Sequence, residues 1–352
     1  MKIKIKNLDL IIFALIFLFI QYGLKNPSFN LKSPYYKEMI IAANKMKTLT
    51  EEIKKEKLNR RIEIDRNVDI NMTGLMGIEW SGISTTLGNE EAKRSSINPD
   101  FAALVVKKLK ELKLQSGDIV AVNMSSSFPA LNLAVISALD TLNLKGIIIN
   151  SVGSSNYGGN IEEFNYLDME KHLISKKMIK NHSIAYSLGG IDDIGKEFEL
   201  STIENIKEKN RDLKFFYNKN FTENLEERYQ FYKNYGQVKA FINIGGNLLS
   251  LGKNTSEIIS NSNVILDEED KKIVKGGLIG KFIQDNIPIL YLLNVKSLCM
   301  SNGIPFDPTP LPEIGISPLY FRSVSSLYYN VGIVILFLIF IIKNSFFHKN
   351  FK

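Results

Sequence analysis

Short apolar runs that end in small polar residues alternate with helical patterns through the middle of the chain. The clearest runs cover residues 118–123 (DIVAVN), 146–150 (GIIIN), 182–187 (HSIAYS), 240–244 (AFINI) and 287–293 (IPILYLL). Runs this short are typical of strands buried on both faces of a sheet. Between them, residues 129–142, 167–179 and 200–209 have helical patterns. The alternation predicts an α/β fold, a Rossmann-like body with a mainly parallel sheet and helices on both faces.

Long apolar segments lie at both ends of the chain. Every residue from Leu10 to Ile20 is apolar, and the run from Val331 to Ile342 is interrupted only by Gly332. A helix that crosses a bilayer needs about 17–25 residues, so both segments are near the short limit. Both are terminal, lack a polar face and have lysines beside them. We therefore expect two terminal transmembrane helices around the body, with a pair of buried core helices as the alternative.

The lysines of the two tails predict the orientation of these helices. Positive charge stays on the cytoplasmic side, so both termini are expected inside and the body outside, in an extracytoplasmic position. No small-x-small cleavage site follows Ile20. The first segment is therefore expected to be a retained signal anchor rather than a cleaved signal peptide.

The chain is expected to divide into six segments. Helical spacing of apolar residues from about Ser33 to Asn59 predicts a helix that could lift the body from a membrane, and five of the ten prolines lie within residues 305–318. The expected segments are a signal-anchor helix (1–24), a helical stalk (25–70), the α/β body (71–300), a Pro-rich strap (301–326), a second transmembrane helix (327–343) and a basic cytoplasmic tail (344–352).

The net charge of +7 belongs mostly to the tails. Residues 1–9 and 343–352 hold six Lys and one Asp, or +5, which leaves the rest of the chain at +2. The basic balance therefore indicates membrane orientation, and no nucleic-acid partner is expected. Cys299 is the single cysteine, so an intramolecular disulfide framework and a Cys-rich zinc site are excluded.

Four of the predicted strands end in loops rich in Ser, Asn and Gly. The loops are 123–127 (NMSSS), 150–156 (NSVGSSN), 187–193 (SLGGIDD) and 243–247 (NIGGN). Ligands of parallel sheets bind beyond the carboxyl ends of the strands, and glycine lets the backbone approach them closely. We therefore expect one shared polar site for a carboxylate or phosphate. For any single loop the alternative is a structural role, such as Ser127 capping the helix that follows it.

A second polar segment, residues 77–98, surrounds the only tryptophan, Trp80. Its cations Lys93 and Arg94 are suited to a carboxylate, although a charge pair near a helix start is an equal alternative. Together with the four loops, this segment supplies the predicted ligand-binding residues, which are Thr85, Lys93, Arg94, Ser125, Ser126, Ser127, Ser154, Gly189, Gly190, Asn243, Gly245 and Gly246.

Catalytic signals are weak. The sequence contains no GxGxxG, GxxxxGK[ST] or GxSxG motif, and only His172 and His182 lie in the body. The catalytic residues stay unknown, and the carboxylates Glu79, Asp168, Asp192 and Asp193 are the candidates for acid–base work. Asp168 and His172 share a helix face but supply too few ligands for a metal site, so neither a metal nor a cofactor is expected.

Six blocks of the sequence, in order, resemble the poly-gamma-glutamate system protein family. They are GIEWSGISTTLGNEEAKRSSINPDFAALVVKKL, GDIVAVNMSSSFPALNLAVISAL, INSVGSSNYGGN, FNYLDMEKHL, SIAYSLGGIDDIG and FINIGGN, and they run from about Gly74 to Gly252. The resemblance implies a protein of the bacterial cytoplasmic membrane that acts beside a ligase-type synthetase and small membrane subunits. It carries over no catalytic residue.

The resulting hypothesis is a membrane-anchored accessory component of poly-gamma-glutamate capsule biosynthesis or export, with a carboxylate-binding α/β body. Its expected partners are poly-gamma-glutamate or glutamate-like carboxylates, the membrane subunits of the polymer synthase and the lipid bilayer. Two alternatives stay open at this point. One is an amide hydrolase or transferase that acts on the polymer, and the other is a non-catalytic scaffold of the synthase complex.

Overall fold

The computed structural model of the chain describes residues 14–18, 31–252, 264–266, 268, 276–322 and 332–340. The chain forms two units, Lys37–Leu319 and the terminal segments Met1–Tyr36 with Tyr320–Lys352. We call the first unit the α/β domain. In the second unit, β1 (Leu31–Lys32) pairs antiparallel with β10 (Phe321–Arg322).

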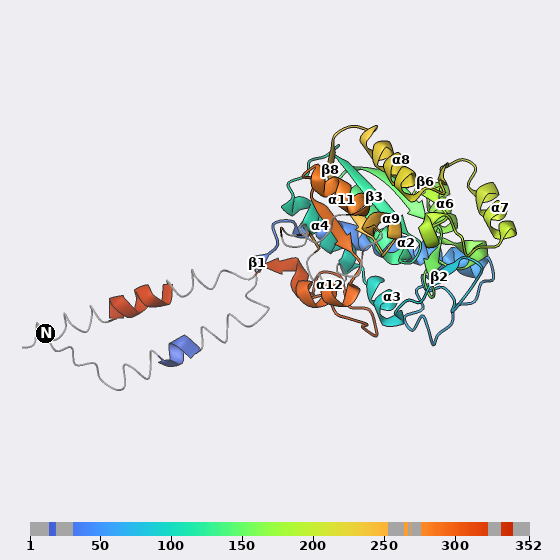
Figure 1. The fold of residues 1–352 in the computed structure, drawn as a ribbon. Coiled ribbons are helices and arrows are strands. Elements are labelled where there is room, and N and C mark those ends of the chain that lie inside the picture. The colour runs from blue at the N-terminus through green and yellow to red at the C-terminus, as the bar shows by residue number, and fades with distance from the viewer. Residues whose placement is uncertain are drawn as a thin grey trace, which may run out of the picture. The chain divides into compact units, whose positions relative to one another are not determined.

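A six-stranded sheet forms the centre of the α/β domain, and its strands run side by side in Figure 1. Their order is β7-β6-β4-β3-β8-β9, and every neighbouring pair is parallel. The bounds are β3 (Ile119–Ser125), β4 (Lys145–Ser151), β6 (Ser183–Ser187), β7 (Lys214–Phe216), β8 (Val238–Ile244) and β9 (Ile289–Leu292). The predicted parallel α/β sheet is confirmed.

The strand order contains a switch point beside β3. The chain moves outward from β3 through β4, β6 and β7, and then returns to the opposite side of β3 with β8 and β9. The connections therefore leave the sheet in opposite directions at β3 and β8. A crevice opens at such a point, beyond the carboxyl ends of the strands, and this is where open α/β sheets bind ligands.

Helices cover both faces of the sheet, as predicted. On one face, α8 (Phe221–Lys233) and α11 (Gly277–Gln284) pack on buried strand residues, and the Phe241 and Phe282 rings stack with centroids 4.4 Å apart. The other face carries α5 (Pro129–Thr141), which is buried along nearly its whole length, with α4 (Asp100–Glu111) packed against it. On that face α6 (Tyr166–Ser175) brings the Tyr166 hydroxyl to 3.8 Å from Met124 Sδ.

The remaining elements of the α/β domain are short, apart from α2. They are α2 (Tyr36–Asn59), β2 (Ser84–Thr86), α3 (Glu90–Ser96), β5 (Ser154–Ser155), η2 (Glu162–Phe164), η3 (Ile191–Asp193), α7 (Leu200–Lys209), α9 (Leu248–Leu251), α12 (Val295–Asn302) and η5 (Pro318–Tyr320). β2 pairs with β5 in a parallel two-stranded sheet. This small sheet joins residues 84–86 to the loop that follows β4.

The helix α2 occupies the segment expected to be a stalk. From Lys37 onward it belongs to the α/β domain, and its apolar stripe, which includes Met39, Ala43, Met46 and Ile53, is fully buried. Lys45 Nζ lies 2.9 Å from the Asp140 carboxylate at the end of α5. The apolar spacing that predicted a helix therefore reflects packing in the core of the domain.

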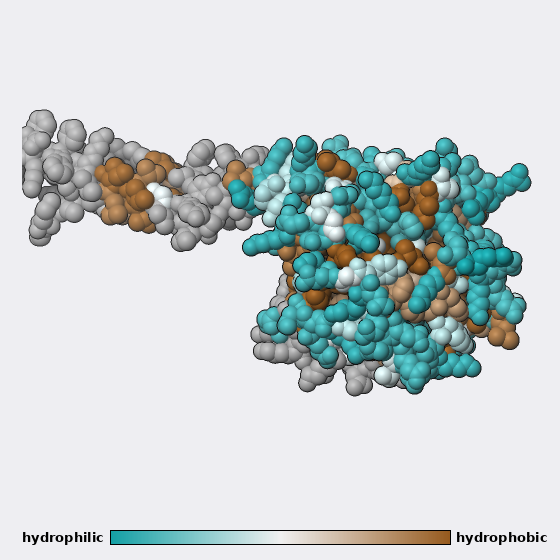
Figure 2. All heavy atoms as spheres, turned by 90° about the horizontal axis from the view of Figure 1, so that it is seen from above, coloured by the Kyte–Doolittle hydropathy of each residue, from teal (hydrophilic) through white to brown (hydrophobic). Residues whose placement is uncertain are grey.

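The predicted transmembrane helices are the part of the fold prediction that is wrong. Among the described residues, no helix combines the length and the apolar character that a membrane span requires. Within the two predicted spans the structure describes helical residues only at 14–18 and 332–340, and the rest of both spans lies outside the described residues. The face of the α/β domain seen in Figure 2 is mainly hydrophilic, with hydrophobic side chains gathered between the polar groups.

Candidate functional site

A pocket of about 540 Å³ lies at the carboxyl ends of the strands. The loops after β3, β4, β6 and β8 all line it, together with residues 85–93 from β2 to α3. The structure thus brings the four Ser-, Asn- and Gly-rich loops together beside the switch point of the sheet. Of the predicted ligand-binding residues, those that line the pocket are Thr85, Lys93, Ser125, Ser127, Gly189, Gly190 and Gly246.

Lys93 is the most unusual of these residues, because its side chain is buried. It lies on α3, whose first turn is capped by Asn89 accepting from the Ala92 N–H, and the residue is only 3% exposed. Its Nζ donates to the Ser127 carbonyl oxygen and, at 2.6 Å, to Ser155 Oγ. The same nitrogen lies 4.4 Å from the centroid of the Phe128 ring.

The contacts of Lys93 are a carbonyl, a hydroxyl and an aromatic ring, and none of them is a carboxylate. Burial disfavours the charged form of a lysine unless an anion compensates for the lost hydration. The loss of hydration lowers the pKa of Lys93 to about 7. The ammonium and the neutral amine are therefore present in similar amounts near pH 7.

A buried ion pair lies beneath the loop after β6, which lines the pocket. Asp193, in the loop after β6, accepts from Arg228 Nη2 of α8, and both side chains are completely buried. The other oxygen, Asp193 Oδ1, accepts from Ser187 Oγ at 2.9 Å and from Asn247 Nδ2 at 3.1 Å. Asn247 also donates to Ser151 Oγ at 2.8 Å, and both of these residues line the pocket. The pair therefore holds the polar floor of the pocket in place.

The loop after β6 has positive backbone φ angles, which residues other than glycine rarely adopt. Gly189 and Gly190 have φ of 75° and 67°, and Asp192 and Asp193 follow at 54° and 66°. Left-handed conformations cost energy at non-glycine residues and persist where surrounding contacts enforce them. The ion pair of Asp193 supplies such contacts, so the loop is held in its shape from beneath.

Arg94, predicted to contact a carboxylate ligand, is used inside the protein. Its Nε and Nη2 bind the two oxygens of Asp307 at 2.8 and 2.7 Å, and Nη1 lies 3.3 Å from Glu90. Asp307 lies in the Pro-rich segment, and its N–H donates to Ser95 Oγ. Arg94 thus links that segment to α3 and does not line the pocket. This pairing agrees with the alternative prediction of a charge pair near a helix start.

Four further predicted residues lie beneath the pocket rather than on its wall. Ser126 donates to Asn150 Oδ1, and Ser154 donates to the Ser126 carbonyl oxygen. Asn243 accepts from Asn123 across β3 and β8 at 3.0 Å. Gly245 has φ of 81°, and a Cβ there would meet Ser125 Cβ at 3.0 Å. These residues support the loops that form the wall.

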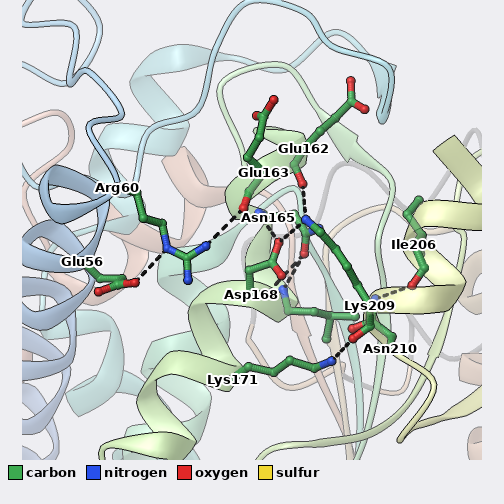
Figure 3. Close-up of polar contacts among 11 residues, drawn as sticks. Glu56, Arg60, Glu162, Glu163, Asn165, Asp168, Lys171, Ile206, Lys209 and Asn210 are labelled. Atoms are coloured by element: carbon green, nitrogen blue, oxygen red, sulfur yellow. Dashed lines mark hydrogen bonds and ion pairs between the residues drawn. The ribbon is translucent and has the colours of Figure 1, made fainter.

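None of the four candidate acid–base carboxylates lines the pocket, and Asp193 is held in the buried ion pair with Arg228. Glu79 is exposed beside Trp80, and Asp192 forms an ion pair with Lys196. Asp168 completes a capping box with Asn165 at the start of α6 and lies 3.3 Å from Lys209 Nζ. Figure 3 shows Asp168 within this cluster of polar contacts between α6 and the end of α7. The structure therefore gives Asp168 a structural role.

Several residues of the site were not predicted. Ser151, Ser155 and Asn247 belong to loops that were predicted, so their positions at strand ends were a usable signal. The sequence gives no such signal for Arg228. It lies in a polar helix, and only the folded structure brings it to Asp193. The exposed side chains of Leu87 and Ile191, which also line the pocket, were not predicted either.

The described residues contain no group of three or more His, Cys, Asp or Glu side chains that could hold a metal ion. His172 Nε2 lies 2.8 Å from Glu52 of α2, so it forms a contact between helices. Cys299 is buried, and burial raises the pKa of its thiol to about 12.

Comparison of the chain with protein-family models, with curated proteins and with solved structures finds no match. The resemblance to the poly-gamma-glutamate system proteins therefore stays a prediction.

Proposed function

We propose that the α/β domain binds the carboxylate groups of glutamate-like ligands in this pocket, as an accessory component of poly-gamma-glutamate biosynthesis or export. The burial of Lys93 among uncharged groups is the observation that supports the proposal. Among the described lining residues it is the only Lys or Arg, and its contacts are all uncharged. The blocks of sequence that resemble the family include the loops after β3, β4, β6 and β8 that line the pocket.

A carboxylate beside Nζ would compensate for the hydration that Lys93 has lost. Opposite charges at short range favour the charged forms of both groups, so the pKa of Lys93 would rise on binding. Because this pKa is about 7 in the free protein, binding at pH 7 should take up about half a proton. Affinity should then fall as pH rises above 7, by up to tenfold for each pH unit.

The test is calorimetry of the full-length chain with γ-glutamyl oligomers, in two buffers of different ionisation enthalpy. We expect binding with proton uptake at pH 7, and at least a tenfold loss of affinity in Lys93→Met. Gly246→Leu should also block binding, because a Cβ at Gly246 meets only Leu293, at 3.8 Å, so a side chain can enter the pocket.

The matched control is Lys239→Met. Lys239 is exposed near the start of β8, at the end of the strand that lies away from the pocket, and its Nζ contacts Gln237. It should bind the oligomers as the wild type does. Equal affinity of Lys93→Met and wild type would overturn the proposal, and the absence of any binding would favour the scaffold alternative.

One distance favours amide hydrolysis as a second candidate function. Lys93 Nζ lies 2.6 Å from Ser155 Oγ, and both side chains line the pocket. A neutral lysine can take the hydroxyl proton while the serine oxygen bonds to an amide carbonyl carbon. The same proton then goes to the amine as the C–N bond breaks, and water releases the acyl group.

The two functions predict opposite responses to pH. Carboxylate binding needs the protonated form of Lys93 and weakens above pH 7, whereas hydrolysis needs the neutral form and accelerates through the same range. Ser155→Ala separates them further, since it should abolish turnover of γ-glutamyl amides and retain binding. Turnover that persists in Ser155→Ala would eliminate the second candidate.

A further inference from the structure

Aliphatic side chains line the same pocket as Lys93. They come from four separate segments: Leu87 before α3, Ile191 after β6, Leu248 at the start of α9, and Leu293 after β9. Leu87 is 83% exposed and Ile191 is 55% exposed. The pocket therefore combines a buried amine and several hydroxyls with two exposed aliphatic side chains, Leu87 and Ile191, and two half-buried ones, Leu248 and Leu293.

The two most exposed of these side chains are attached to backbone that is held in place. The Ile191 N–H donates to both oxygens of Glu197 at 3.1 Å, and Gly190 before it takes the left-handed φ that turns the chain there. Next to Leu87, the Gly88 N–H donates to Asn156 Oδ1. Large apolar side chains that stay exposed on fixed backbone around a pocket mark a surface that a ligand covers.

We infer that the ligand of this pocket joins its carboxylate to an extended aliphatic segment, with the carboxylate at Lys93 and the aliphatic segment against Leu87, Ile191, Leu248 and Leu293. The inference rests on the proposed function, and it narrows the class of ligand. A carboxylate without such a segment would leave the aliphatic side chains exposed. The methylene pairs of a γ-glutamyl chain satisfy the requirement only in part, and longer aliphatic carboxylates satisfy it fully.

Straight-chain monocarboxylates from acetate to octanoate test the inference, titrated into the full-length chain at pH 6 and followed by NMR. At that pH Lys93 is mostly protonated, because its pKa is about 7. Each methylene that becomes buried should tighten binding about three- to fourfold until the apolar lining is covered. Leu87→Asn and Ile191→Asn should flatten this rise with chain length.

The matched control is Leu200→Asn, since Leu200 is 79% exposed at the start of α7 and does not line the pocket. It should keep the full dependence on chain length. A flat series in the wild type, with binding that still depends on Lys93, would overturn this inference and leave the proposed function intact. If Lys93→Met binds every ligand as tightly as the wild type does, the proposed function is contradicted as well.

Discussion

Two buried cations of the α/β domain have different surroundings, and only Lys93 lines the pocket. Arg228 reaches Asp193, and the carboxylate of Asp193 is in turn bound by Ser187 and Asn247. Lys93 is almost as deeply buried and meets only uncharged groups. The first cation is neutralised by the fold, whereas the second would gain a neutralising partner from a ligand. The proposed function therefore depends on the lack of a carboxylate among the contacts of Lys93, and not on its burial alone.

The difference also separates stability from function. A buried ion pair adds little net stability, yet the removal of one partner leaves an uncompensated charge in the interior. A buried lysine without a carboxylate can lose its proton instead, so its removal costs little. Three experiments test this contrast.

The largest effect on stability is expected when the ion pair between Arg228 and Asp193 is broken. Arg228→Met leaves Asp193 buried without its cation and should lower the free energy of unfolding by about 3–5 kcal/mol in urea denaturation. Lys93→Met should change the same quantity by less than about 1 kcal/mol at pH 7. The double variant Arg228→Met with Asp193→Asn should recover part of the loss, because the orphaned charge is gone. Equal losses in Arg228→Met and Lys93→Met would break the comparison.

An intermediate effect is expected from pH. The folded-state pKa of Lys93, about 7, lies below the value of about 10.4 for an unfolded lysine. Between these values the unfolded chain binds more protons, so stability rises with pH. Lys93 should contribute a rise of about 2 kcal/mol in the free energy of unfolding between pH 7 and pH 9.

Lys57 acts in the same direction, since burial lowers its pKa to about 8. The informative quantity is therefore the difference between wild type and Lys93→Met, measured by denaturant titration at each pH. A pH dependence that is identical in the two proteins would show that Lys93 keeps its proton in the folded state.

The smallest effect is expected at Arg94, which sits on the same helix as Lys93 but is paired. Arg94→Gln removes a bidentate contact with Asp307 that is partly exposed, and it should cost about 1 kcal/mol of stability. Ligand affinity in calorimetry should stay within twofold of the wild type. A tenfold loss of affinity would place Arg94 in the binding site and contradict its structural role.

The central strands and the location of the site could be predicted because both leave a local signal. A strand covered on both faces must be a continuous apolar run, and β3, β4, β6, β8 and β9 all lie within one or two residues of the predicted runs. β7 escaped prediction because it is only three residues long and begins with Lys214. The loops that line the pocket follow the strands directly, so the same apolar runs also predicted where the pocket lies.

What escaped prediction depends on contacts between distant residues. The sequence around Lys93, EEAKRSS, has the composition of a solvated helix, and its burial arises only when the loops after β3 and β4 close over it. Arg94, next to it, is also a cation, but it is paired with Asp307. This partner lies 213 residues away in the chain, so no local pattern reveals the pairing. The predicted membrane spans rested on the apolar composition, the terminal position and the neighbouring lysines of two segments, whereas no described helix is long and apolar enough to cross a membrane.

The switch point of the sheet also has a consequence for how the chain acquires its structure. β3 lies at the centre, but its partner β8 comes late, and the contact between Asn123 and Asn243 closes a separation of 120 residues. Until β8 is synthesised, one edge of an apolar strand has no neighbour to accept its backbone hydrogen bonds. Such an edge is a template for pairing with other chains, and non-local pairing is slow. A nascent chain that stops short of residue 238 should therefore aggregate, whereas one that extends past β9 can bury every central strand.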